Sequence, residues 1–114
     1  MANSTGEKIS IEESVKFILA HNKRVTTDTE IEFVGVRVGQ EDILTLTELG
    51  AKDFVVFHAV ENKSNTVIIM GLDDDDKFIK DTDDKIVAIE RWQKFGPTVQ
   101  EVNDDPTKLT DLFN

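Results

Sequence analysis

The 114-residue chain contains no cysteine. This absence excludes disulfide bridges, thiolate nucleophiles and cysteine-bound zinc or iron–sulfur centres. The chain also lacks a long hydrophobic run, and its start lacks the basic residues followed by an apolar stretch that a secretory signal needs. We therefore expect a soluble cytoplasmic protein that folds as one domain, since the chain is short for two.

Basic residues are few: the chain has 13 Lys and Arg against 23 Asp and Glu, so its formal net charge is −10. Such a charge repels nucleic acids and anionic membranes and attracts basic partners. The 39% of hydrophobic residues is still enough for a folded core. Composition therefore favours another protein with a basic surface as the partner, with no direct nucleic-acid or membrane binding.

The first half of the chain predicts helix, strand and helix. Ser10 and Glu13 have the spacing of a capping box, and the apolar residues that follow recur at helical intervals for about three turns. The segment 30–39 alternates and changes face near Gly35, which predicts a strand with a bulge. The segment 40–53 predicts a short helix that stops at Gly50.

The second half predicts strands. The segments 54–61 and 66–72 are joined by the polar turn at 62–65 and form a hairpin. Both are apolar on both faces, which places them at the centre of a sheet. The segment 85–92 predicts another strand, ended by Gly96 and Pro97.

We therefore predict an α+β fold with an N-terminal helix packed on an antiparallel sheet of about four strands, plus short additional helical segments. Residues 1–8 form a flexible tail, and residues 9–97 form the domain. Residues 98–114 form a C-terminal segment, docked or free, with Asp105 and Pro106 as the cap and first position of a last helical turn. No internal repeat is predicted.

The acidic segment GLDDDDKFIKDTDDK is the connection between two predicted strands. As a calcium loop it fails, because Lys77 occupies a ligand position and the required glycine is missing. No metal and no cofactor are predicted. The remaining hypotheses are a solvated loop, a mimic of nucleic-acid phosphates, or a patch in which an apolar pair, Phe78 and Ile79, lies within an acidic rim. The alternative for this pair is that it folds back onto the core and anchors the loop. The candidate partner-binding residues here are Asp73, Asp74, Asp75, Asp76, Phe78, Ile79, Asp81, Asp83 and Asp84.

No catalytic residues are predicted. His58 shares its alternation face with apolar residues, which favours a packed, hydrogen-bonded core histidine over a general base. Asp53, Glu61 and Lys63 resemble the acid, acid-x-lysine pattern of metal-dependent nucleases. The two acids bracket one predicted strand of about 25 Å and cannot meet on one ion.

The last residues, KLTDLFN, offer a peptide ligand. This ending resembles the short C-terminal peptides with which replication and transcription proteins of bacteria and their large phages dock on a sliding clamp. The resemblance implies that Leu112 and Phe113 fill a pocket and that Leu109 makes an outlying contact. The competing hypothesis is a tail that folds back and buries the same three side chains.

These observations predict a small acidic, non-enzymatic protein-binding module, such as an inhibitor, immunity or accessory factor. It would act through its acidic face and its C-terminal peptide. The alternatives are a nucleic-acid mimic that inhibits a DNA- or RNA-binding enzyme, and a metal-dependent enzyme. The oligomeric state stays open.

Overall fold

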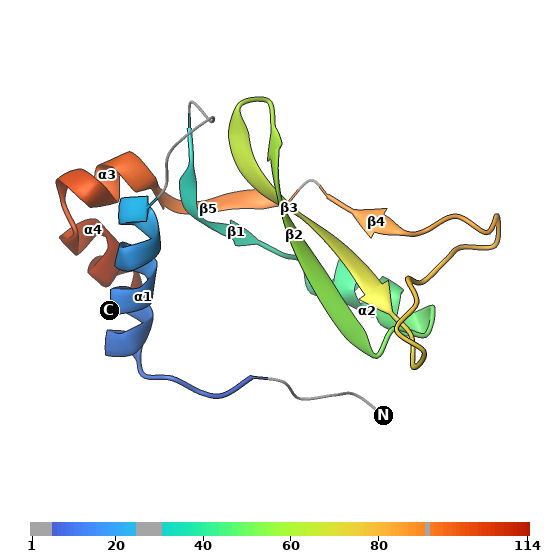
Figure 1. Ribbon diagram of the computed structural model, residues 1–114. Helices are drawn as coiled ribbons and strands as arrows, with labels where there is room; N and C mark the ends of the chain where they lie inside the picture. Colours follow the sequence, from blue (N-terminus) through green and yellow to red (C-terminus); the bar gives the residue numbers. More distant parts are fainter. Residues whose placement is uncertain (1–5, 25–30, 91) are drawn as a thin grey trace.

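The computed structural model describes residues 6–24, 31–90 and 92–114 (Figure 1). Helices combine with two antiparallel sheets, which confirms the α+β class. Within the described residues, no helix is long and apolar enough to cross a membrane. In chain order the elements are α1 (Ile11–Arg24), β1 (Phe33–Arg37), α2 (Gln40–Glu48), β2 (Asp53–Glu61), β3 (Ser64–Leu72), β4 (Ala88–Ile89), β5 (Gln93–Thr98), α3 (Val99–Asp104), α4 (Thr107–Thr110) and the 3-10 helix η1 (Asp111–Phe113).

Helix α1 begins where the capping pattern predicts. The hydroxyl of Ser10 accepts a hydrogen bond from the backbone N–H of Glu13 at 3.0 Å. The carbonyl of Ser10 accepts the first helical bond from Ser14 at 2.9 Å. These bonds satisfy groups that the first turn of a helix otherwise leaves unpaired. The helix packs against α3 at one end of the molecule (Figure 1).

The smaller sheet pairs β1 with β5, and its register shifts between Phe33 and Gly35, at the predicted bulge. The expectation that Gly96 and Pro97 end a strand is wrong, because both lie within β5. Pro97 is tolerated because β5 has one partner strand and so leaves half of its N–H groups outside the ladder. The strand predicted over 85–92 is reduced to β4, which has two residues.

The larger sheet has the order β2-β3-β4. Its hairpin is tighter than the predicted turn over 62–65, because only Asn62 and Lys63 connect the strands. Both have positive φ, 52° and 63°, as a type I′ turn requires. Asn65 belongs to β3, and its side chain binds the backbone N–H and C=O of Phe33 at 2.7 and 3.1 Å. This amide ties the start of β1 to the hairpin.

The predicted central position is correct for β3 and wrong for β2. In the described residues β2 pairs with β3 alone and is an edge strand. Four of its large apolar side chains are exposed: Phe54 (39%), Val56 (50%), Phe57 (41%) and Val60 (57%). Apolar residues on both faces usually indicate a strand buried on both sides, but here they belong to an uncovered one.

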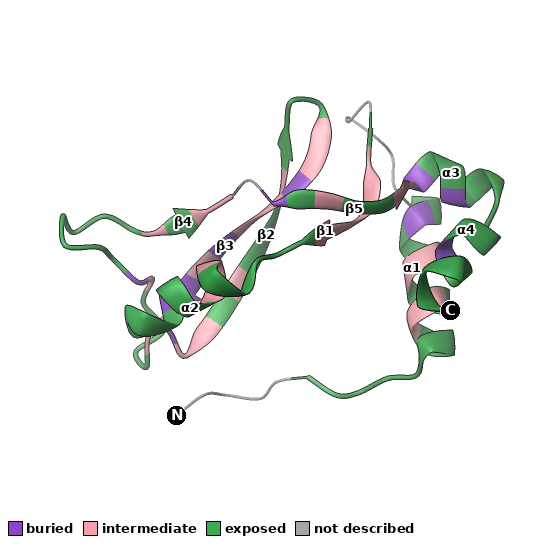
Figure 2. Ribbon diagram, turned by 180° about the vertical axis from the view of Figure 1, so that it is seen from behind, coloured by how far each residue is buried: buried purple, intermediate pink, exposed green. Residues whose placement is uncertain are grey.

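The buried hydrophobic residues lie in two regions of the molecule (Figure 2). Under the larger sheet the core comprises Leu46, Ala51, Ile69, Ile79 and Trp92. Val99, Val102 and Leu109 are buried at the helical end. The radius of gyration is 16.2 Å, whereas a compact chain of this length has about 13 Å. The elongated shape leaves a groove open between the two sheets.

Candidate functional site

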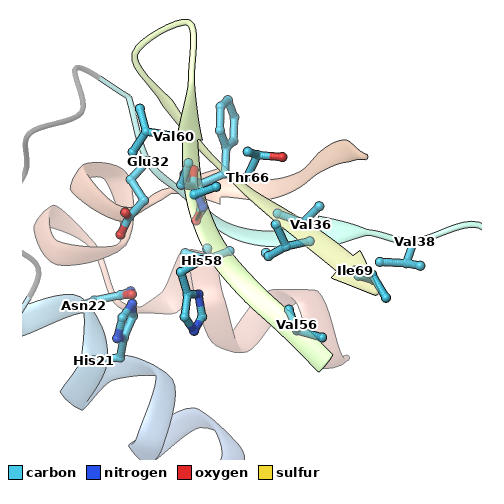
Figure 3. Close-up of a pocket in the computed structure, with 16 residues that line it drawn as sticks. His21, Asn22, Glu32, Val36, Val38, Val56, His58, Val60, Thr66 and Ile69 are labelled. Atoms are coloured by element: carbon cyan, nitrogen blue, oxygen red, sulfur yellow. Dashed lines mark hydrogen bonds between the residues drawn. The ribbon is translucent and has the colours of Figure 1, made fainter. Parts of the chain in front are cut away.

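An open groove of about 660 Å³ lies between β1, the β2–β3 hairpin and the last turn of α1 (Figure 3). Six valine and isoleucine side chains from three strands line it, together with Val38, which follows β1, and we call it the valine groove. Its aliphatic lining consists of Val34, Val36, Val38, Val56, Val60, Val67 and Ile69. Such a surface can take up apolar side chains of a ligand.

One end of the valine groove is polar. His21 and Asn22 come from the last turn of α1, Glu32 precedes β1, and His58 lies on β2 (Figure 3). Asn22 is only 2% exposed, and its Nδ2 atom has no hydrogen-bond partner among the described residues. A buried amide nitrogen without an acceptor is uncommon in folded proteins and calls for an explanation.

The expectation that His58 is a packed core histidine is wrong. Its side chain is exposed and lines the groove. The alternation correctly places it on one face with Val56 and Val60. That face lines the open groove between the two sheets. The position of the groove depends on the distant strand β1, so the local sequence pattern of β2 cannot predict it.

The hairpin turn fixes which backbone groups of β2 face the open edge. The residues that flank a two-residue turn, here Glu61 and Ser64, form a hydrogen-bonded pair, and such pairs alternate along an antiparallel ladder. The odd-numbered residues of β2 therefore bond to β3. The N–H and C=O groups of the even-numbered residues point away from β3, and these residues are Phe54, Val56, His58 and Val60.

The acidic segment contains two turns of the same construction. In the first, Asp73 Oδ1 accepts hydrogen bonds from the backbone N–H groups of Asp75 at 2.8 Å and Lys77 at 3.1 Å. In the second, Asp81 accepts the equivalent two bonds at the same distances. The residue before each lysine has positive φ, 57° and 61°. The expectation of no internal repeat is wrong, since D-x-D-D-K recurs eight positions later.

The two turns connect β3 to β4 as a small meander. Leu72 forms an isolated antiparallel β-bridge with Phe78, and Lys80 forms another with Ile86. Ile79, between the turns, is buried in the core, so its side chain is not available to a partner. Phe78 is half-buried, with its ring 6.4 Å from that of Phe57. Of the predicted apolar pair, neither residue is an exposed anchor.

The candidate acidic side chains lie on the surface of this meander. Six of them are exposed and Asp73 is half-buried: the exposed ones are Asp74, Asp75, Asp76, Asp81, Asp83 and Asp84. Lys80 forms an ion pair with Asp84 at 3.4 Å. Two of the carboxylates serve as acceptors for their own turns, which accounts for part of the run in structural terms.

Within the C-terminal segment, helix α4 packs against β5 and α3. Leu109 is 1% exposed, whereas Leu112 and Phe113 are 40% and 43% exposed. Leu112 lies over Gly96: a Cβ added at Gly96 would be 3.2 Å from Cδ1 of Leu112. A peptide ligand that used all three side chains would have to leave this position.

Two carboxylates stabilise the C-terminal helices. The backbone N–H of Thr98 donates to Glu101 and lowers the pKa of this carboxyl, and the Thr98 hydroxyl adds to the effect. The Thr107 hydroxyl and N–H donate to Asp105, at 2.6 and 3.1 Å, and lower the pKa of Asp105. These bonds hold Asp105 at the start of α4, whose first residue is Thr107 and whose N-cap position is Pro106, so the predicted cap and first position each lie one residue too early.

The residues considered for chemistry do not converge. Asp53 and Glu61 stand at the two ends of the nine-residue β2. Across residues 6–24, 31–90 and 92–114, no three His, Asp or Glu side chains are grouped so that they could hold a metal ion.

No protein-family model, curated protein or solved structure matches the chain.

Proposed function

We propose that this chain is a non-enzymatic protein-binding module that takes an extended, basic segment of another protein along the open edge of β2. The single observation that carries the proposal is the arrangement of that edge. Four consecutive even-numbered residues direct outward N–H and C=O groups that have no strand partner in the described part of the chain, beside a groove lined with aliphatic side chains. A strand added there forms main-chain hydrogen bonds, while its alternate side chains enter the groove.

The edge lacks the usual protection against strand pairing. Natural edge strands are short, or carry lysine, proline or a bulge. β2 has nine residues, pairs without a register shift, and contains neither lysine nor proline. Its exposed valines therefore favour pairing with an incoming strand.

The charge of the chain favours a basic partner. The net charge of −10 attracts a basic segment and repels a second copy of the chain. Antiparallel pairing of the whole of β2 with β2 of a second molecule would also place Asp53 opposite Glu61 at both ends of the ladder. Like charges directly opposite each other destabilise such a ladder. The acidic meander contributes to this attraction without itself forming the groove.

A nine-residue peptide in which valine and lysine alternate tests the proposal. Fluorescence anisotropy should show saturable binding, and hydrogen exchange should slow at the amides of Phe54, Val56, His58 and Val60. Two control peptides carry N-methyl groups on one or the other alternate set of backbone nitrogens. Only the set that faces β2 should abolish binding, because it removes the donors of the new ladder.

Equal binding of the two N-methylated peptides would reject strand addition, as would the absence of any binding. A nucleic-acid mimic would instead bind basic surfaces with no dependence on either N-methyl pattern. Its binding would disappear at raised salt, because screening acts on exposed charges.

A further inference from the structure

The polar end of the valine groove contains a donor, the side-chain nitrogen of Asn22, that has no acceptor among residues 6–24, 31–90 and 92–114. Asn22 stands two residues before the end of α1, and the strand edge of β2 carries His58 on the same groove (Figure 3). Leaving the amide nitrogen of Asn22 buried and unpaired destabilises the free chain, because its hydrogen bond to water is lost without replacement. An aliphatic residue would fill the same space without this penalty.

We propose that Asn22 recognises a hydrogen-bond-accepting side chain of the added strand, so that the groove selects aliphatic residues interrupted by one amide or hydroxyl oxygen. This inference rests on the proposed function. A strand added to β2 runs past the end of α1, since residues of both elements line one groove. The amide nitrogen is shielded in the free chain, and binding turns it toward the ligand.

The alternation of the added strand restricts the accepting position. Side chains on one face of a strand repeat every second residue, so one face of the ligand meets the groove. Most of the lining is aliphatic, and Asn22 is at the end with His21 and His58. A single accepting oxygen at one groove-facing position is therefore favoured, and a polar residue at the other positions is disfavoured.

The test uses methionine and methionine sulfoxide as a matched pair. The sulfoxide has the same chain length and adds one neutral acceptor without a donor. In the valine–lysine peptide, each valine in turn is replaced by methionine, which is then oxidised. At one position the sulfoxide peptide should bind about three- to tenfold more tightly than its methionine form, the value of one net hydrogen bond.

The protein variants are Asn22→Leu and Asn22→Asp. Both lack the donor, so at that position the sulfoxide should bind more weakly than methionine, a reversal of the preference. Asn22→Leu should also raise the melting temperature of the free protein, because it removes a buried unpaired group. If Asn22→Leu does not fold, Asn22→Asp of nearly identical shape supplies the comparison.

The outcomes separate this inference from the proposed function. If the peptides bind but sulfoxide and methionine are equivalent at every position, Asn22 recognition is wrong and strand addition stands. The same holds if Asn22→Leu lowers the melting temperature, because the amide then has a partner in the free chain. If no peptide binds, strand addition itself is wrong.

Discussion

Proline substitution at two adjacent positions of β2 tests which of its edges is open. Proline removes one backbone N–H and fixes φ near −65°. The N–H of Val55 faces β3 and bonds to Met70, whereas that of Val56 faces outward. Val55→Pro and Val56→Pro impose similar changes of φ on neighbouring strand residues. The difference between them therefore isolates the ladder hydrogen bond.

The expected difference follows from the structure. Val55→Pro loses about 1 kcal/mol of hydrogen bonding and leaves a carbonyl of β3 unpaired, for a further ~1–3 kcal/mol. Val56 is 50% exposed, so replacing its side chain costs about 1 kcal/mol or less. We expect Val55→Pro to lower the free energy of unfolding by about 2 kcal/mol more than Val56→Pro does.

Urea denaturation followed by tryptophan fluorescence provides the measurement. Trp92 is the single tryptophan and is 7% exposed, so unfolding changes its environment. Unchanged denaturant slopes would show that the comparison concerns stability alone. Equal destabilisation by the two prolines would refute the assignment of the open edge. Val56→Pro should in addition abolish binding of the valine–lysine peptide, because it removes an outward donor.

Three further predictions concern the scaffold. Gly71→Ala should cost about 1–3 kcal/mol of folding free energy through overpacking, since the added Cβ would lie 2.6 Å from a neighbouring side-chain carbon. Gly35→Ala is the control: the atom nearest to its added Cβ is 3.7 Å away, so a melting assay should show that alanine is tolerated there. Asp81→Ala should cost about 1 kcal/mol, comparable to loss of a helix cap, and Asp83→Ala should cost less. The pKa of Glu101 is lowered in the folded state from an ordinary 4.5, so its stabilising effect is present above that pH and is lost as the pH falls through the lowered value. Glu101→Gln keeps an acceptor and should flatten this acid dependence in melting curves.

Three local patterns in the sequence predict the local structure correctly. The serine cap of α1, the bulge near Gly35 and the end of α2 before Gly50 each depend on residues within one or two turns of chain. Gly50 has a φ of 109°, a backbone angle that residues with a Cβ rarely adopt. Such signals are carried by the residues themselves, and the fold class follows from their order.

The edge position of β2 could not be predicted in this way. It depends on which strands pair, and the β1–β5 sheet joins Phe33 to Thr98 across most of the chain. Without that pairing, an apolar strand is expected to be covered, and His58 is expected to be packed. The repeated turn could have been found, because Asp73 and Asp81 begin the same D-x-D-D-K pattern. Interpretation of the segment as one acidic run concealed it.

The acidic charge and the open edge of β2 explain one another. An uncovered apolar edge normally leads to self-association, which repulsion between copies of charge −10 opposes. At 1 M salt the screening length falls to about 3 Å, so this repulsion is largely removed while the hydrogen-bonding edge is unchanged. We therefore expect a concentration-dependent dimer at 1 M salt in sedimentation velocity, and a monomer at low salt. Val56→Pro should stay monomeric under both conditions. A dimer at high salt that persists in Val56→Pro would mean that the charge protects another surface.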